Sequence, residues 1–195
     1  MKVIVLNRKR LGVTIIIIGL MLVLVGAELS LSHRLKMTAL IQNGMDSLKV
    51  YQIKDTNITY QLPDTWKTSE KNFGANEITY HNEFSSADNV IYGYVQIWNL
   101  RQKDLRAFLE DSKTSSFSAN RVRDYKYVPV KVNSYPAYLL TYNGSTASGN
   151  NFKAYEYFIE DNSKFFRIAF YVPADKFKEN MPTIFEAIAN TYSRK

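Results

Sequence analysis

The chain has 195 residues, no cysteine and a formal net charge of +7 at pH 7. This length is typical of one domain plus an appendage. The missing cysteines exclude disulfides, iron–sulfur clusters, thiol catalysis, thiolate zinc sites and anchoring through a lipidated cysteine. Four basic residues precede Leu11, so the rest of the chain holds 21 basic and 18 acidic residues. A body this close to charge balance lacks the concentrated basic charge that nucleic acid requires, and we expect no nucleic-acid partner.

An uncharged apolar segment runs from Leu11 to Ala27. As a helix it would span roughly 25 Å, which is near the lower limit for crossing a bilayer. The basic residues before it place the N-terminus in the cytoplasm and the rest of the chain outside, by the positive-inside rule. We therefore expect residues 1–27 to form a cytoplasmic basic start and a transmembrane helix in the cell membrane. These basic residues are Lys2, Arg8, Lys9 and Arg10.

Two fates of this segment remain open. Small residues at 25–27 fit a signal peptide cleaved after Ala27, which would release a secreted protein. We favour a retained single-pass anchor, because Leu31, Leu35 and Ala39 recur every four residues and Asn43-Gly44 is a good helix stop. Residues 28–47 would then form a helical stalk, or alternatively a flexible linker, before an extracytoplasmic domain at 48–195.

The first half of that domain reads as strands. Short strands are predicted at 50–53 and 58–62 around a turn at 55–57, and another at 78–81. A longer strand at 89–100 alternates, with Tyr92, Tyr94 and Trp98 on one face and aliphatic residues on the other. Because both faces are partly apolar, it is expected to be a central strand with something packed on each side.

The second half predicts a helix at 103–113, a polar loop at 115–124, and strands at 127–132, 137–142, 152–159 and 165–172. A polar hairpin tip is expected at 143–151 and a tight turn at 160–163. The chain should close with a helix within 174–192 that begins or kinks at Pro182, and Ser193-Arg194-Lys195 should place positive charge at its C-terminus. The fold class is therefore α+β, an antiparallel β-sheet with helices packed on it, preceded by one transmembrane helix.

Three stretches resemble the PsbP-like fold, which is shared by the extrinsic PsbP protein of photosystem II and the Mog-type Ran-binding proteins. The first is Ile-Thr-Tyr-Gln-Leu-Pro-Asp-Thr-Trp at 58–66, which matches an extended Tyr-x-Leu/Phe-Pro-x-x-Trp opening. The second is Val-Asn-Ser-Tyr-Pro-Ala-Tyr at 132–138, and the third is the closing hairpin and helix at 155–192. These motifs report fold far better than function.

The resemblance implies a largely non-enzymatic protein that acts by binding. It implies no particular binding residues, because neither the metal-associated positions of PsbP nor the Ran-contacting surface of the Mog-type proteins has a matching motif here. Bacterial members of the family often lie behind a signal peptide or anchor. The Lys-, Asn-, Ile- and Tyr-rich composition is typical of a low-GC Gram-positive bacterium.

Aromatic side chains on one strand face form the first candidate binding site. Tyr92, Tyr94 and Trp98 have the spacing of one face of a strand, and their rings could stack on sugars or pack against a partner protein. The competing interpretation is that a helix of the same domain covers them.

A basic stretch interleaved with tyrosines forms the second candidate. Such a patch could bind an anionic polymer such as lipid headgroups or teichoic acid. The competing interpretation is a solvated edge strand, where basic residues hinder aggregation. The residues are Arg121, Arg123, Tyr125 and Lys126, with Tyr127 and Lys131 following.

No residue pattern indicates catalysis, a metal or a cofactor. The two histidines are His33, beside the membrane segment, and His81, at the end of a predicted strand near Glu83 and Asp88. A metal site needs three or four converging ligands. We interpret His81 and Glu83 as a surface polar pair at a strand end. An enzyme with a dispersed site around His81 is the least favoured hypothesis.

These observations predict a membrane-anchored extracytoplasmic binding or accessory module that is not catalytic. Its partner would be a protein or a cell-envelope polymer. The alternative is a structural subunit of an envelope complex that packs through its anchor helix. Gly12 and Gly19 are seven residues apart, so they do not form the GxxxG motif that would support that alternative.

Overall fold

The computed structural model describes residues 14, 16–23, 45, 47–74, 77–100, 104–118, 122–161 and 163–194, with the side chains of 115–118 excepted. Of the predicted membrane segment, residues 14 and 16–23 are described, and they are helical and exposed. The rest of that segment and nearly all of the predicted stalk at 28–47 lie outside the described residues. Within the described ranges, no helix has both the length and the apolar character needed to cross a membrane.

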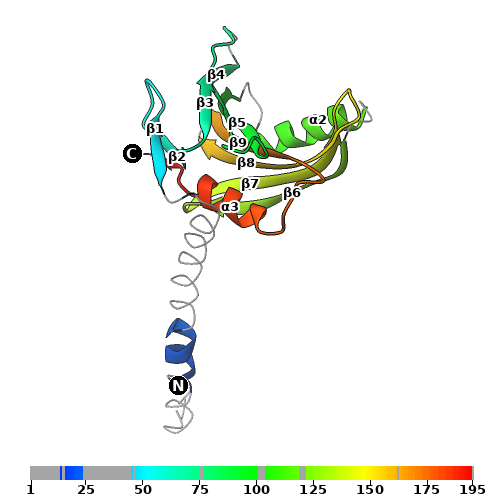
Figure 1. Cartoon of the computed structure of the whole chain (residues 1–195). Helices are drawn as coiled ribbons and strands as arrows, with labels where there is room; N and C mark the ends of the chain where they lie inside the picture. The colour runs from blue at the N-terminus through cyan, green and yellow to red at the C-terminus, as the bar shows by residue number, and fades with distance from the viewer. Residues whose placement is uncertain are drawn as a thin grey trace.

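A seven-stranded antiparallel sheet forms the body of the domain (Figure 1). Its strand order is β3-β4-β5-β9-β8-β7-β6, so β5 and β9 bring together segments from the two halves of the chain. The antiparallel class that the sequence predicts is therefore confirmed. The strands are β3 (Lys67–Glu70), β4 (Ile78–Ser85), β5 (Tyr92–Asn99), β6 (Val122–Val132), β7 (Tyr135–Ser145), β8 (Asn151–Asp161) and β9 (Lys164–Pro173).

A second, three-stranded sheet contains the two ends of the domain. Its order is β1 (Leu48–Gln52), β2 (Ile58–Pro63) and β10 (Ser193–Arg194), with β2 in the middle. The predicted turn between β1 and β2 is confirmed, and Asp55 takes the left-handed backbone conformation there. The C-terminus lies beside this sheet in Figure 1.

The main core lies between one face of the large sheet, the small sheet and α3 (Met181–Ala189). Phe185 of α3 stacks on Phe170 of β9, with ring centroids 4.6 Å apart. Trp66 follows β2 and stacks on Phe84 of β4 at 5.3 Å. Burying aromatic side chains of this size supplies most of the driving force for a domain that has no disulfide.

The opposite face of the large sheet is only partly covered. Helix α2 (Leu105–Ser118) packs over part of it with a smaller core. Phe108 of α2 lies 4.9 Å from the ring of Phe165 and 5.8 Å from that of Trp98. The side chain of Asp104 accepts the backbone N–H of Ala107 and caps the helix. The uncovered part of this face holds the site described below.

Two predicted loops are misplaced. Of the loop expected at 115–124, residues 115–118 belong to α2 and residues 122–124 belong to β6. The polar tip expected at 143–151 is shorter, because β7 runs to Ser145 and β8 begins at Asn151. Once part of a helix or strand has formed, backbone hydrogen bonds extend it through adjacent polar residues. Polarity alone therefore does not predict where these elements end.

The last helix is also shorter than 174–192. It occupies only Met181–Ala189, with Pro182 in its first turn, which confirms the first of the two roles expected for this proline. Residues 193–194 do not extend a helix terminus but pair with β2 as β10. Strand β3 escaped prediction because its sequence, Lys-Thr-Ser-Glu, is fully exposed and has no apolar alternation.

Candidate functional site

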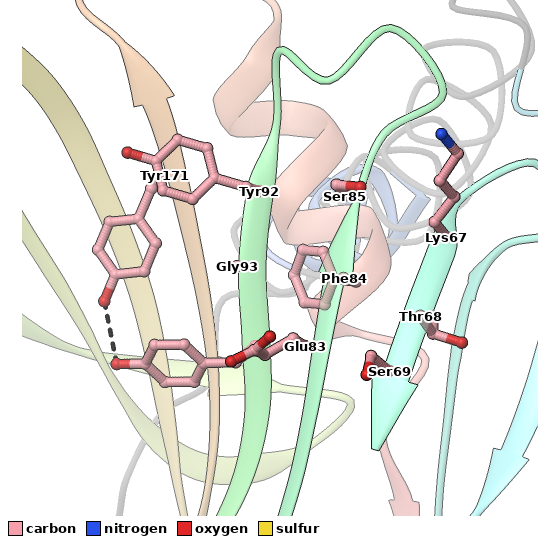
Figure 2. Close-up of a pocket in the computed structure, with 10 residues that line it drawn as sticks. Lys67, Thr68, Ser69, Glu83, Phe84, Ser85, Tyr92, Gly93 and Tyr171 are labelled. Carbon is pink, nitrogen blue, oxygen red and sulfur yellow. Dashed lines mark hydrogen bonds between the residues drawn. The ribbon is translucent and has the colours of Figure 1, made fainter. Parts of the chain in front are cut away.

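A groove of about 470 Å³ opens on the uncovered part of the large sheet. Its walls come from strands β3, β4, β5 and β9 (Figure 2). Figure 2 shows Tyr92 and Tyr171 on one side, Ser69 and Ser85 on the other, and Glu83 between them. We call this site the tyrosine groove and define it by Ser69, Glu83, Ser85, Tyr92, Tyr94 and Tyr171.

The groove arises from a step in side-chain size across neighbouring strands. In one row of cross-strand partners, Ser85 faces Tyr92, and Tyr92 faces Tyr171. In the next row, Ser69 faces Glu83, and Glu83 faces Tyr94. Side chains in such rows stand on the same face of the sheet. Small serine side chains therefore lie beside large tyrosine side chains, and the space above the serines forms the groove.

The tyrosine wall is a pair of stacked rings. The centroids of Tyr92 and Tyr171 are 5.6 Å apart and their planes differ by 23°. Tyr92 remains 39 % exposed, whereas Tyr171 is half-buried behind it. Burial raises the pKa of Tyr92, and it raises the pKa of Tyr94 to about 12. These hydroxyls therefore stay protonated near neutral pH and can donate hydrogen bonds.

A buried carboxylate fixes the tyrosines from below. Glu156 of β8 is fully buried, and its Oε1 accepts the hydroxyls of Tyr171 at 2.8 Å and Tyr142 at 2.9 Å. Tyr94 donates to the Tyr171 hydroxyl at 3.0 Å, the dashed line in Figure 2. The orientation of Tyr94 and Tyr171 is thus set by hydrogen bonds within the domain, and Tyr92 stacks on Tyr171.

Arg167 of β9 neutralises this carboxylate. Its Nε and Nη2 donate to Oε2 of Glu156 at 2.9 and 2.6 Å. Burial by itself would lower the pKa of the Arg167 guanidinium. The charge of Glu156, the neighbouring Tyr94 and Tyr171, and the hydrogen bonds to Glu156 together outweigh burial and raise that pKa. The guanidinium also lies over the rings of Tyr94 and Phe158, 5.0 and 5.1 Å from their centroids.

His81 belongs to a second polar chain on the same face. It is only 5 % exposed, so the prediction of a surface polar pair at a strand end is wrong for this residue. Its Nδ1 accepts the amide N–H of Gln96 at 2.8 Å, and its Nε2 lies 3.4 Å from Glu83. Burial lowers the pKa of His81. Both ring nitrogens are thus engaged with neighbours in a part of the sheet shielded from solvent.

Glu83 links this chain to the groove. The ammonium group of Lys71 lies 2.6 Å from its carboxylate, and that hydrogen bond lowers the pKa of Glu83. The carboxylate is therefore charged at neutral pH and half-exposed on the groove floor. Among the residues that the structure describes, no three Asp, Glu or His side chains gather closely enough to hold a metal ion.

The structure separates the members of the predicted aromatic site. Tyr92 and Tyr94 line the groove. Trp98 lies on the same sheet face but packs under α2, and its Nε1 donates to Gln96 at 2.7 Å. Helix α2 therefore covers the Trp98 end of this face, as the competing interpretation expects, and leaves the Tyr92 end open.

The predicted basic patch lies on the other edge of the sheet, on β6. Arg123 and Lys126 are exposed there, while Arg121 lies outside the described residues. Tyr125 is turned inward, and its hydroxyl donates to the backbone carbonyl of Leu109 in α2 at 3.2 Å. The pairing of β6 with β7 shifts between Arg123 and Lys126, which is the irregularity that edge strands commonly show. Strands β8 and β7 separate this patch from the groove, whose nearest wall is β9.

Sequence reasoning missed four members of the site and its support. These residues lie on strands whose order in the sheet is decided only when the sheet folds. A signal was present for two of them. Arg167 is the single charged residue of the predicted strand at 165–172, and Glu156 lies among apolar residues in the predicted strand at 152–159 with the opposite charge. The missed residues are Glu83, Glu156, Arg167 and Tyr171.

The fold and groove define a class: an α+β domain on a twisted antiparallel sheet, open on part of one face. The sequence matches no family model and no curated protein. Among solved structures, the chain is similar to cyanobacterial PsbP (CyanoP) from Synechocystis sp. PCC 6803, with a TM-score of 0.56 and 12 % identity over 76 % of this chain and 93 % of that one. The domain therefore has a PsbP-like fold, as the sequence motifs predict.

Two further solved structures are similar to this chain over about three quarters of its length. A protein from Bacteroides thetaiotaomicron VPI-5482 has a TM-score of 0.52 and 12 % identity over 75 % of this chain, which spans 48 % of that protein. LpqN of Mycobacterium tuberculosis, described as involved in cell envelope biogenesis, has a TM-score of 0.47 and 11 % identity over 76 % of this chain and 91 % of LpqN. Identities this low carry information about fold alone.

Proposed function

We propose that this chain is a membrane-anchored extracytoplasmic accessory module that acts by binding a protein or cell-envelope polymer and is not a catalyst. The observation that carries the proposal is the tyrosine groove. It is an open concave surface with half-exposed rings, and the polar groups beneath it are hydrogen-bonded to one another. Binding sites typically combine such concavity with a few convergent polar groups.

The engagement of His81 supports binding over catalysis. A general base must reach the proton that it removes from a substrate or nucleophile. The imidazole of His81 is instead held between Gln96 and Glu83, and its ring contacts Phe73 and Tyr94 with centroids 4.7 and 5.4 Å away. These contacts are those of a histidine that stabilises the sheet.

The location in the proposal rests on the apolar segment from Leu11 to Ala27 and the basic residues before it. Because the chain has no cysteine, single cysteines can report its topology without background. In intact cells, we expect a membrane-impermeant thiol reagent to label Lys176→Cys in the exposed turn before α3, and to spare Lys2→Cys until the cells are lysed. Labelling of Lys2→Cys alone in intact cells, or of neither position, would contradict the proposed orientation.

Binding at the groove can be tested by photocrosslinking of the full-length chain in cells. The photoreactive residue benzoylphenylalanine is introduced in place of Lys67, which is exposed at the groove rim. We expect discrete adducts from this position, and none from the matched replacement of Lys176 on the other side of the domain. Identical adduct patterns from both positions, or none from Lys67, would count against a binding function at the groove.

A further inference from the structure

We infer that the tyrosine groove binds a carbohydrate chain, with Tyr92 and Tyr171 as the stacking surface for a sugar ring. This inference rests on the proposed binding function and names its ligand class. Sugar rings have apolar C–H faces and a rim of hydroxyl groups. A complementary site therefore needs an exposed aromatic face next to fixed hydrogen-bonding groups.

The aromatic face is present and unusually open. The rings of Tyr92 and Tyr171 are nearly parallel and 5.6 Å apart across β5 and β9, so Tyr171 supports the exposed ring of Tyr92. Tyr92 is the most exposed tyrosine of the described domain, at 39 %, whereas Tyr60, Tyr157 and Tyr192 are at most 4 % exposed. Leaving such a ring in water forgoes the free energy of burying it, and a ligand with an apolar face recovers that free energy.

The hydrogen-bonding groups face the rings across the groove. Glu83 supplies a carboxylate that Lys71 holds in its charged form, so it can accept two sugar hydroxyls. The hydroxyls of Ser69 and Ser85 can each donate and accept. A hydroxyl-rich ligand uses both kinds of group, whereas an alkyl chain would displace the water that reaches the half-exposed Glu83 and offer no hydrogen bond in its place.

The site is also fixed before the ligand arrives. Tyr171 is held by Glu156 and Tyr94 by Tyr171, and Arg167 lies over the Tyr94 ring. Rings that are already ordered lose little side-chain entropy on binding, which favours a weakly stacking ligand such as a sugar. A volume of about 470 Å³ lies within the range of small-ligand sites and suits a short stretch of a glycan.

The test measures saccharide binding by the full-length chain, solubilised in a detergent without a sugar headgroup. The probes are the tetrasaccharides of N-acetylglucosamine, glucose and mannose, and binding is followed by calorimetry and by saturation-transfer NMR of the saccharide. We expect at least one probe to bind. Tyr92→Ala should weaken that binding about tenfold, and Tyr92→Phe should retain it within about twofold, because the ring and not the hydroxyl stacks.

Two further variants separate stacking from a general loss of structure. Phe177→Ala removes one ring of another stacked pair, that of Tyr155 and Phe177 on the opposite face, and should leave saccharide binding unchanged. Ser69→Trp adds bulk from the exposed edge strand β3 and should block the groove without disturbing the core. Ser69→Trp therefore tests the site even if Tyr92→Ala fails to fold.

Binding of no saccharide, or equal binding by wild type and Ser69→Trp, overturns the inference. If crosslinking from Lys67 then still captures a protein, the binding function stands and only the carbohydrate class is wrong. If both experiments are negative, the proposed function fails with it.

Discussion

Replacing Arg167 with methionine is expected to lower the free energy of unfolding by about 3–5 kcal/mol, because it leaves the buried charge of Glu156 without its counterion. Methionine matches the length of the arginine stem, so the effect is mainly electrostatic. Tyr142 and Tyr171 would still donate to the carboxylate, but neutral hydroxyls cannot replace a guanidinium. Urea titration of the full-length chain, followed by the fluorescence of Trp66 and Trp98, measures the loss.

The matched control is Arg194→Met. Arg194 pairs with Asp161 at the surface, and its side chain is 39 % exposed. Solvent screens such pairs, so this variant should lose less than about 1 kcal/mol. Adding Glu156→Gln to Arg167→Met should recover stability, because the uncompensated charge is then gone. Equal losses in Arg167→Met and Arg194→Met would show that the buried pair does not organise the sheet.

Gly93→Ala is expected to cost about 3 kcal/mol or more, at the upper end of the usual effect of overpacking. A Cβ atom at Gly93 would lie 1.9 Å from the backbone carbonyl oxygen of Ala169 on β9 and 2.7 Å from the ring of Phe84. A backbone atom in a central ladder cannot move alone, so β5 would have to shift relative to β9. The lower chain entropy of alanine in the unfolded state offsets only a small part of this cost.

Gly144→Ala provides the comparison. The three atoms nearest to its Cβ would be outer atoms of the Phe152 ring, the closest at 2.3 Å, and that side chain can rotate. We expect a loss of about 1 kcal/mol. The same urea titration compares both variants, and a smaller loss for Gly93→Ala than for Gly144→Ala would contradict the close approach of β5 and β9. Since Gly93 lies between Tyr92 and Tyr94, Gly93→Ala should also distort the tyrosine groove.

The structure shows the fold of the domain, whereas its location and its function need separate experiments. The PsbP-like fold organises the large sheet and, with it, the tyrosine groove. The anchor, the orientation across the membrane and the binding function remain proposals. The cysteine labelling, crosslinking and saccharide experiments address them separately, because each can fail without the others.

Several features of this protein followed from the sequence by itself. Alternating apolar residues predicted the interior strands, and the turn residues at 55–57 and 160–163 marked their hairpins. Pro182 predicted the start of the last helix. Proline has no backbone N–H, and in the first turn of a helix that N–H would have no acceptor within the helix. These are local effects, since each depends on the conformational preferences of a few neighbouring residues.

The site needed the tertiary structure. The strand order decided that β5 lies beside β9, and only then do Tyr92 and Tyr171 stack and Arg167 reach Glu156. Alternation showed that Tyr92, Tyr94 and Trp98 share a face, but the reach of α2 decided that Trp98 is covered and Tyr92 is open. The residue pattern along one strand shows which side chains share a face of the sheet. Which strands become neighbours depends on packing across the whole sheet.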